Sequence, residues 1–487
     1  MTLLKKFKLL QIFIVSAVLF SLFSCSGIFF DKDSKEFSND SEFLYMMYLA
    51  GDTSISNLGK ALQKNINDLI SGLKNSSLAL NERNVNVIVF ADFTGKSKLF
   101  CANYPYFVLT DISEEAEFIQ DDCNSGDILT LGKFLKFANE RFSAEKKILT
   151  IGSHGSGIFG TKEDYKNPFE TSLSYRSICP DNDSSSSKNM MWILESQLPY
   201  AFDYAGFKDS EKLDLLHLDL CLEGGIEVAY ELKKNVKYFL ASPEQIPAEG
   251  FPYSKMESLF ARGTSIEDFG ISCVEIYANQ NYYGSGWYNT LTFASLDESY
   301  MEELKNSVNA LSDYLSKSEN EYLEDILEDI LEDIKSNFFG VSKLAYYPGK
   351  YIRYNGNYAF MYDFGFFAEK LKEYAESNKN QELQALCSKV LSSLEKIIIR
   401  SWREKINGSS ENLYDDFSGN YYGLSIAVKA IPVNVSHILN NYISDYPKKE
   451  YSESGKYLLN PYYSSEFSFK NDTSWKNFLS VLYPEDF

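Results

Sequence analysis

The chain contains two nearly continuous apolar runs, Lys147-Ile-Leu-Thr-Ile-Gly-Ser-His-Gly-Ser-Gly157 and Leu213-Asp-Leu-Leu-His-Leu-Asp-Leu-Cys-Leu-Glu-Gly-Gly225. Such runs are typical of strands in a parallel sheet that is covered on both faces. His154 comes at the end of the first run and Cys221 at the end of the second. Because the carboxyl ends of parallel strands border one crevice, an imidazole there can activate a thiol as a nucleophile.

Strand-like and helical patterns alternate on both sides of these runs, from residue 43 to about residue 298. This rhythm predicts an α/β fold with a mostly parallel sheet of about six strands flanked by helices. From residue 299 to residue 487 the pattern changes to a mainly helical C-terminal region with some strands, in which one helix is expected from Gln381 to Lys405.

A polar segment, residues 161–190, separates the two reactive strand ends and contains the run Pro180-Asp-Asn-Asp-Ser-Ser-Ser-Ser-Lys188. Inserts of this length are functional or disordered. Because it lies next to a reactive thiol, the insert is a candidate site of self-cleavage; a variable surface loop is the alternative.

The composition narrows the class of protein. The formal net charge is −21, which argues against binding to a phosphate backbone, so we expect no nucleic-acid partner. An apolar fraction of 44% and an aromatic fraction of 15% exclude a mostly disordered chain. We expect a monomer.

The first residues have the pattern of an export signal, with Lys5, Lys6 and Lys8 before an apolar stretch from Leu9 to Phe23. The following Cys25 lies in a sequence that resembles a bacterial lipobox. Residues 1–24 are therefore predicted to be a lipoprotein signal peptide, Cys25 the lipidated residue and residues 25–42 a tether. An ordinary secretory signal is the alternative. The expected location is the bacterial cell envelope, facing the periplasm or the surface.

Cysteine and histidine spacing excludes several metal-dependent classes. Six cysteines follow Cys25 without a CxxC pair, and the three histidines form no HExxH motif, so no zinc site is expected. Cys101 with Cys123 is the first disulfide to test. His217 is expected to pack on the sheet face opposite Asp219, and His437 to be a surface or core residue.

Asp219 precedes Cys221 by two residues at the same strand end. A buried carboxylate needs a partner. Here the partner is a substrate Arg or Lys; alternatively, nearby backbone amides hold Asp219 or it caps the following helix. Gly155 and Gly157 follow His154 and allow a sharp turn with exposed amides, which suits an oxyanion site.

Together these motifs resemble the clostripain-like cysteine peptidases, which have a caspase-like fold. The likeness runs from about residue 43 to the end. It is carried by Ser153-His154-Gly155, by Asp219-Leu-Cys221 and by further segments: Tyr45–Asp52, Val85–Asp92, Glu227–Leu232, Ala241–Glu244, Gly250–Tyr253, Tyr362–Phe364, Gly423–Ile426 and Thr473–Leu479.

The resemblance implies that Cys221 is the nucleophile, His154 the general base and acid, and the amides of Gly155 and Cys221 the oxyanion donors. It also implies that Asp219 selects Arg or Lys, and that the insert is a self-processing site. We expect that no cofactor is required. The family resemblance makes calcium the one cofactor to consider. Leu222-Glu223 and Ala427-Val-Lys429 depart from the family pattern, which affects fine specificity rather than the dyad.

Two other interpretations remain. The first is a surface lipoprotein that keeps the fold and binds a host or envelope protein without hydrolysing it. The second is an aspartate-specific caspase-like enzyme, which would need a basic pocket in place of Asp219.

Overall fold

The computed structural model describes residues 40–53, 58–76, 84–103, 105–155, 157–158, 178–181, 191, 193, 197–244, 246–279, 290–317, 345–346, 357–403, 422–433 and 466–482. The predicted signal peptide, Cys25, most of the tether, most of the insert and His437 lie outside these residues. No helix in the described ranges is long and apolar enough to cross a bilayer.

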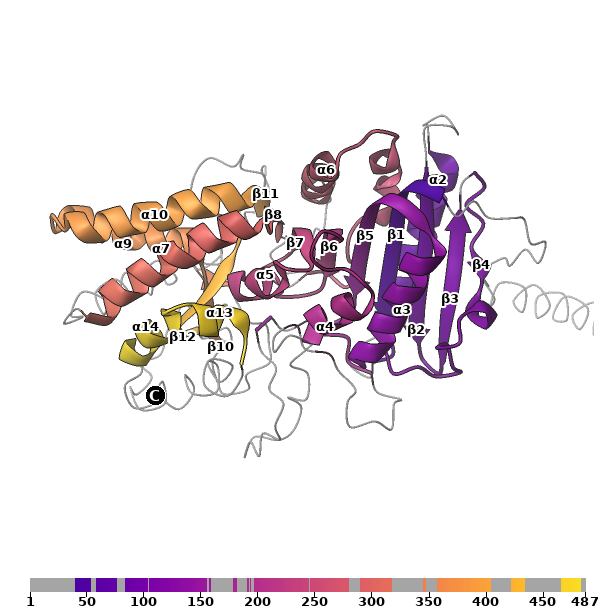
Figure 1. The fold of residues 1–487 in the computed structure, drawn as a ribbon, viewed down its shortest axis with the longest axis horizontal. Helices are drawn as coiled ribbons and strands as arrows, with labels where there is room; N and C mark the ends of the chain where they lie inside the picture. The colour runs from indigo at the N-terminus through magenta and orange to yellow at the C-terminus, as the bar shows by residue number, and fades with distance from the viewer. Residues whose placement is uncertain are drawn as a thin grey trace, which may run out of the picture.

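A nine-stranded sheet, in the order β11-β8-β7-β6-β5-β1-β2-β3-β4, forms the centre of the molecule (Figure 1). Its middle strands pair in parallel: β2 (Val85–Phe93), β1 (Asp40–Ala50), β5 (Ser143–Gly152), β6 (Leu213–Asp219) and β7 (Val236–Ala241). The strands toward both edges pair antiparallel: β3 (Lys96–Asn103), β4 (Thr110–Asp111), β8 (Thr290–Ser295) and β11 (Ile398–Arg403). The predicted α/β class is confirmed.

Helices cover both faces of this sheet, and side-chain alternation along the strands divides the core. In β1, Tyr45 and Met47 belong to the cluster that contains α2 (Leu58–Asn75) and α6 (Ile266–Ala278). Met46 and Tyr48 belong to the other cluster, with α3 (Ile128–Arg141), α4 (Gln197–Tyr204) and α5 (Ile226–Leu232). The period of two in a strand therefore determines which helices each side chain meets.

The sheet has three more strands than the approximately six predicted. Gly95, at φ +76°, turns the chain after β2 so that β3 can pair back onto it, with β4 beyond. The helix predicted from Gln381 to Lys405 was too long: α10 (Gln381–Ile397) ends where the β-branched run Ile397-Ile-Ile399 begins, and β11 pairs with β8. β-Branched side chains favour the strand.

The C-terminal region packs beside the β8 and β11 edge of the sheet (Figure 1). Its described residues include the long helices α7 (Glu298–Lys317), α9 (Phe364–Ser377) and α10. A smaller sheet has the order β12-β10-β9, from Ser425–Val433, Asn357–Asp363 and Ala345–Tyr346. The short helices α13 (Ser468–Asp472) and α14 (Trp475–Leu482) follow. The apolar cluster that contains α3 also includes residues of α7, α9, α10 and α14, so one core crosses this junction.

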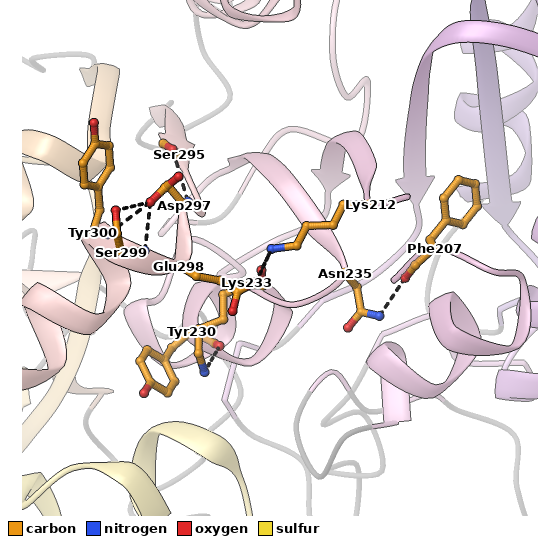
Figure 2. Close-up of polar contacts among 10 residues, drawn as sticks. All are labelled: Phe207, Lys212, Tyr230, Lys233, Asn235, Ser295, Asp297, Glu298, Ser299 and Tyr300. Atoms are coloured by element: carbon orange, nitrogen blue, oxygen red, sulfur yellow. Dashed lines mark hydrogen bonds and ion pairs between the residues drawn. The ribbon is translucent and has the colours of Figure 1, made fainter. Parts of the chain in front are cut away.

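Polar contacts fix the first turn of α7 to the strands of the main sheet, as Figure 2 shows. Lys212, just before β6, donates to the carboxylate of Glu298 at 2.6 Å and to the carbonyl oxygen of Lys233 at 2.7 Å. Asp297 accepts from the backbone N–H groups of Ser299 and Tyr300 and so caps the helix. The start of α7 is therefore held where the chain leaves β8.

Candidate active site

The pairing register of β5 and β6 brings the two reactive strand ends together. Gly152 pairs with Asp219, and His154 and Cys221 each follow two residues later. A Cβ on Gly155 would lie 2.6 Å from the carbonyl oxygen of Cys221, so the two loops are in direct contact. His154 and Cys221 therefore occupy neighbouring loops at the carboxyl edge of the sheet.

Glycine is required in the loop after His154 because the Cys221 loop approaches so closely. At Gly155 a Cβ would also lie 2.7 Å from Glu223 Oε1, and at Gly157 it would lie 2.7 Å from the Leu222 carbonyl oxygen. The N–H of Gly157 donates to Glu223 Oε1 at 2.9 Å. The fully buried Glu223 thus ties the two loops together, a role that the sequence did not indicate beyond its departure from the family pattern.

The Cys221 thiol lies beside the backbone of Ile246, in the segment after β7. The N–H of Ile246 is 3.5 Å from Sγ, and Sγ is 3.9 Å from the Ile246 carbonyl oxygen. Burial, together with the negative charges of Glu223 and Asp219, raises the pKa of this thiol to about 11, while the hydrogen bond from the Ile246 N–H acts in the opposite direction. In this state the thiol is protonated at neutral pH.

The His154 imidazole is partly buried, and its Nε2 has no hydrogen-bond partner within the described ranges. Burial lowers the pKa of His154 below its usual value, so the ring is neutral at pH 7. The backbone carbonyl oxygen of His154 accepts a hydrogen bond from the backbone N–H of Cys179 at 3.3 Å. Cys179 of the insert therefore lies against the histidine loop. The resting pair is a neutral thiol and a neutral imidazole.

A neutral resting pair predicts slow alkylation of Cys221 by iodoacetamide at pH 7. Because only the thiolate reacts, the rate is expected to rise about tenfold per pH unit between pH 7 and 9.5. Quantification of the Cys221 peptide by mass spectrometry at several pH values measures this rate. A rate already at its maximum at pH 7 would contradict the prediction, because it would reveal a preformed thiolate–imidazolium pair.

The two backbone amides expected to hold an oxyanion, those of Gly155 and Cys221, lie in these same loops. Within the described residues, no backbone acceptor is found for either N–H.

Asp219 is 6% exposed, and its carboxylate accepts two hydrogen bonds on Oδ2. Tyr253 Oη donates at 2.6 Å and the Phe251 N–H at 3.2 Å. Both interpretations of Asp219 therefore remain open, because a backbone amide does hold it while the described residues place no donor on Oδ1. Tyr253 ends the Gly250–Tyr253 segment, and nothing in the sequence pattern indicated its contact with Asp219.

The expectation for His217 was wrong. His217 and Asp219 are two residues apart in β6, so they face the same side of the sheet. The His217 ring packs edge-on against Phe251, whose N–H binds Asp219. His217 Nδ1 lies 3.4 Å from the Thr150 hydroxyl, and burial lowers its pKa. It therefore lies on the same side of the sheet as Asp219 and packs against the loop whose Phe251 N–H binds this carboxylate.

All six cysteines in the described part of the chain are free, so the Cys101–Cys123 disulfide is not formed. The described residues also contain no group of three or more His, Cys, Asp or Glu side chains that could hold a metal ion. No residue is therefore assigned to calcium, and no chemical step is derived through it.

The C-terminal region holds the segment after Cys221 in place. The Ser425 N–H donates to the carbonyl oxygen of Gly224 at 3.0 Å, and the Ala427 N–H donates to Glu227 Oε1 at 2.9 Å. Every residue of α5 is buried. The conformation of the Cys221 loop thus depends on residues about 200 positions later in the chain.

Comparison with known proteins places this geometry in a family. The sequence profile described as the clostripain family matches residues 47–481. Clostripain from Hathewaya histolytica is 24% identical over 319 residues, which cover 60% of this chain and 56% of that protein, so the match spans about half of its length.

Two solved structures share the fold. An inactive zymogen C11 protease from Parabacteroides distasonis superposes with a TM-score of 0.52 at 17% identity, covering 89% of this chain and 98% of that one. A secreted C11 cysteine protease from Bacteroides thetaiotaomicron, iotapain, gives a TM-score of 0.52 at 18% identity, covering 80% and 93%. Because the family profile extends over nearly the whole chain, this protein belongs to the clostripain family of cysteine peptidases.

Proposed function

We propose that the chain is an exported, lipid-anchored cysteine endopeptidase that cleaves after Arg or Lys by means of a His154–Cys221 dyad. The observation that carries the proposal is the contact between the His154 and Cys221 loops at the ends of paired parallel strands, with the buried Asp219 at the same edge. The family match over residues 47–481 supports the reaction class.

In this mechanism His154 takes the proton of the Cys221 thiol as the sulfur attacks the substrate carbonyl carbon. Since the resting pair is neutral, the proton transfer accompanies the attack. The Gly155 and Cys221 N–H groups hold the oxyanion. The imidazolium then protonates the leaving amine, and water activated by His154 hydrolyses the thioester. These steps need no cofactor.

Selection of a basic residue depends on Asp219 in this proposal. An Arg or Lys side chain that reaches Oδ1 forms a charge-assisted hydrogen bond with a carboxylate that is shielded from water. The net charge of −21 adds a weak long-range preference for cationic partners.

A panel of fluorogenic peptides with Arg, Lys, Ala or Asp before the scissile bond tests the activity. The parent protein is expected to cleave the Arg and Lys peptides, and Asp219→Asn to lower their kcat/KM by about a hundredfold while cleavage after Ala changes little. Equal cleavage after basic and neutral residues by the parent would refute the role of Asp219. Cleavage after Asp would favour a caspase-like specificity. If no cleavage depends on Cys221, the alternative of a lipoprotein that only binds a partner would be favoured.

Self-processing within residues 161–190 is part of the proposal. Residues 178–181 of this insert support the proposal by their contacts: Ile178 pairs with Met191, the Cys179 N–H binds the His154 carbonyl oxygen, and Asp181 accepts from the Ser125 N–H at 2.7 Å. Mass spectrometry of the purified mature protein detects a cut in this segment and, at the same time, a lipid on Cys25. Detergent-phase partitioning that is lost in Cys25→Ala tests the anchor and the envelope location.

A further inference from the structure

We propose that Tyr253 is a positioning residue that sets the preference for basic substrates by holding Asp219 in one orientation. This inference rests on the role of Asp219 in the proposed function. It adds a residue that donates to the carboxylate from a different part of the chain.

The two hydrogen bonds to Asp219 come from one loop and end on one oxygen. Tyr253 Oη is 2.6 Å from Oδ2 and the Phe251 N–H is 3.2 Å from the same atom. A short O–H···O⁻ contact of this kind is charge-assisted and is among the stronger hydrogen bonds in proteins. Both donors bind Oδ2, and no donor is found for Oδ1 among the described residues; Oδ1 is the oxygen that the proposed function assigns to a substrate Arg or Lys.

The loop that carries these donors allows little variation. Gly250 has φ +64°, and a Cβ there would lie 2.6 Å from Asp219 Oδ2 and 3.0 Å from the Asn65 side-chain amide. With its amide oriented to donate, the Asn65 nitrogen lies 2.9 Å from the Glu249 carbonyl oxygen. Helix α2 thus anchors the loop while Gly250 brings it against the carboxylate.

The Tyr253 ring is itself held rigidly. It is fully buried and packs edge-on against Phe251, whose ring stacks on Tyr277. At the start of the 3-10 helix η3 (Tyr253–Lys255), a Cβ on Gly72 of α2 would lie 2.5 Å from the Ser254 carbonyl oxygen. The hydroxyl therefore reaches Asp219 from a fixed ring, as a positioning role requires.

The test measures binding in the Cys221→Ala protein, so that it does not depend on hydrolysis. The probes are a hexapeptide with Arg before the scissile bond and the same peptide with citrulline, a neutral analogue of Arg. Calorimetry compares Tyr253→Phe with Tyr45→Phe, a matched control. Tyr45 is a fully buried tyrosine in the same core, whose hydroxyl contacts Thr150 at 2.7 Å.

Tyr253→Phe is expected to weaken binding of the Arg peptide by about tenfold to a hundredfold, the range for a hydrogen bond to a charged group. Tyr253→Phe is expected to change the Kd of the citrulline peptide by no more than about twofold. Tyr45→Phe is expected to change the Kd of either peptide by no more than about twofold. Equal loss for Arg and citrulline, or no loss for Arg, overturns the inference in favour of a purely structural tyrosine.

The remaining outcomes separate this inference from the proposed activity. Binding of Arg that depends on Tyr253, in a parent protein that hydrolyses nothing, overturns the activity alone. An Arg peptide bound no more tightly than its citrulline analogue overturns the inference, whether or not the parent hydrolyses peptides.

Discussion

Replacement of Cys221 by alanine is expected to lower kcat for the best Arg or Lys peptide by about 10⁴- to 10⁶-fold. The sulfur is the atom that forms the acyl-enzyme, and no neighbouring group can replace it. His154→Ala is expected to have an effect of similar order, because the thiol, with its pKa raised to about 11, has almost no thiolate at pH 7 without a base. Because the two residues act as one unit, the double variant should be no slower than Cys221→Ala.

A matched control separates this chemical role from the loss of a buried thiol. Cys387 is a fully buried thiol in α10 of the C-terminal region, and Cys387→Ala is expected to retain kcat within about threefold. Steady-state kinetics on folded protein, checked by circular dichroism, makes the comparison. Measurable turnover at the parent rate in Cys221→Ala would end the proposal of thiol catalysis.

Trp475→Ala is expected to lower the free energy of unfolding by about 3–5 kcal/mol, the cost of emptying a large aromatic site in a core. The Trp475 ring is fully buried in α14, where it packs against Phe364, Phe367 and Phe478. Its Nε1 donates to the Ala427 carbonyl oxygen at 2.7 Å. Since the Ala427 N–H binds Glu227 in α5, the cavity should also loosen the segment that follows Cys221.

Urea unfolding measures the loss of stability, and peptide cleavage in the absence of urea measures the loss of activity. Trp475→Phe serves as the control, because it keeps most of the ring contacts and removes the N–H; a loss of only about 1–2 kcal/mol is expected. If Trp475→Ala were as stable as the parent, or fully active while destabilised, the proposed support of the Cys221 loop by the C-terminal region would be wrong.

Much of the fold could be predicted from the sequence because the central strands are apolar nearly throughout. The strands around His154 and Cys221 and the α/β class follow from local periodicity, whereas α4, which lies between these two strands, was not predicted. The strands that the sequence did not predict lie toward the edges of the main sheet. β3 is half-polar, and β11 continues a helical pattern, so only their pairing with β2 and β8 identifies them as strands.

The sequence by itself determined which chemistry this protein can attempt, since strand ends carrying His154, Asp219 and Cys221 can be read from consecutive residues. Only the tertiary structure decided how these groups are held. The register of β5 with β6, the contact of Tyr253 with Asp219 and the contact of Ser425 with Gly224 join residues that are distant in the chain. The physical reason is that periodicity acts over a few residues, whereas such contacts depend on packing and loop closure across the whole core.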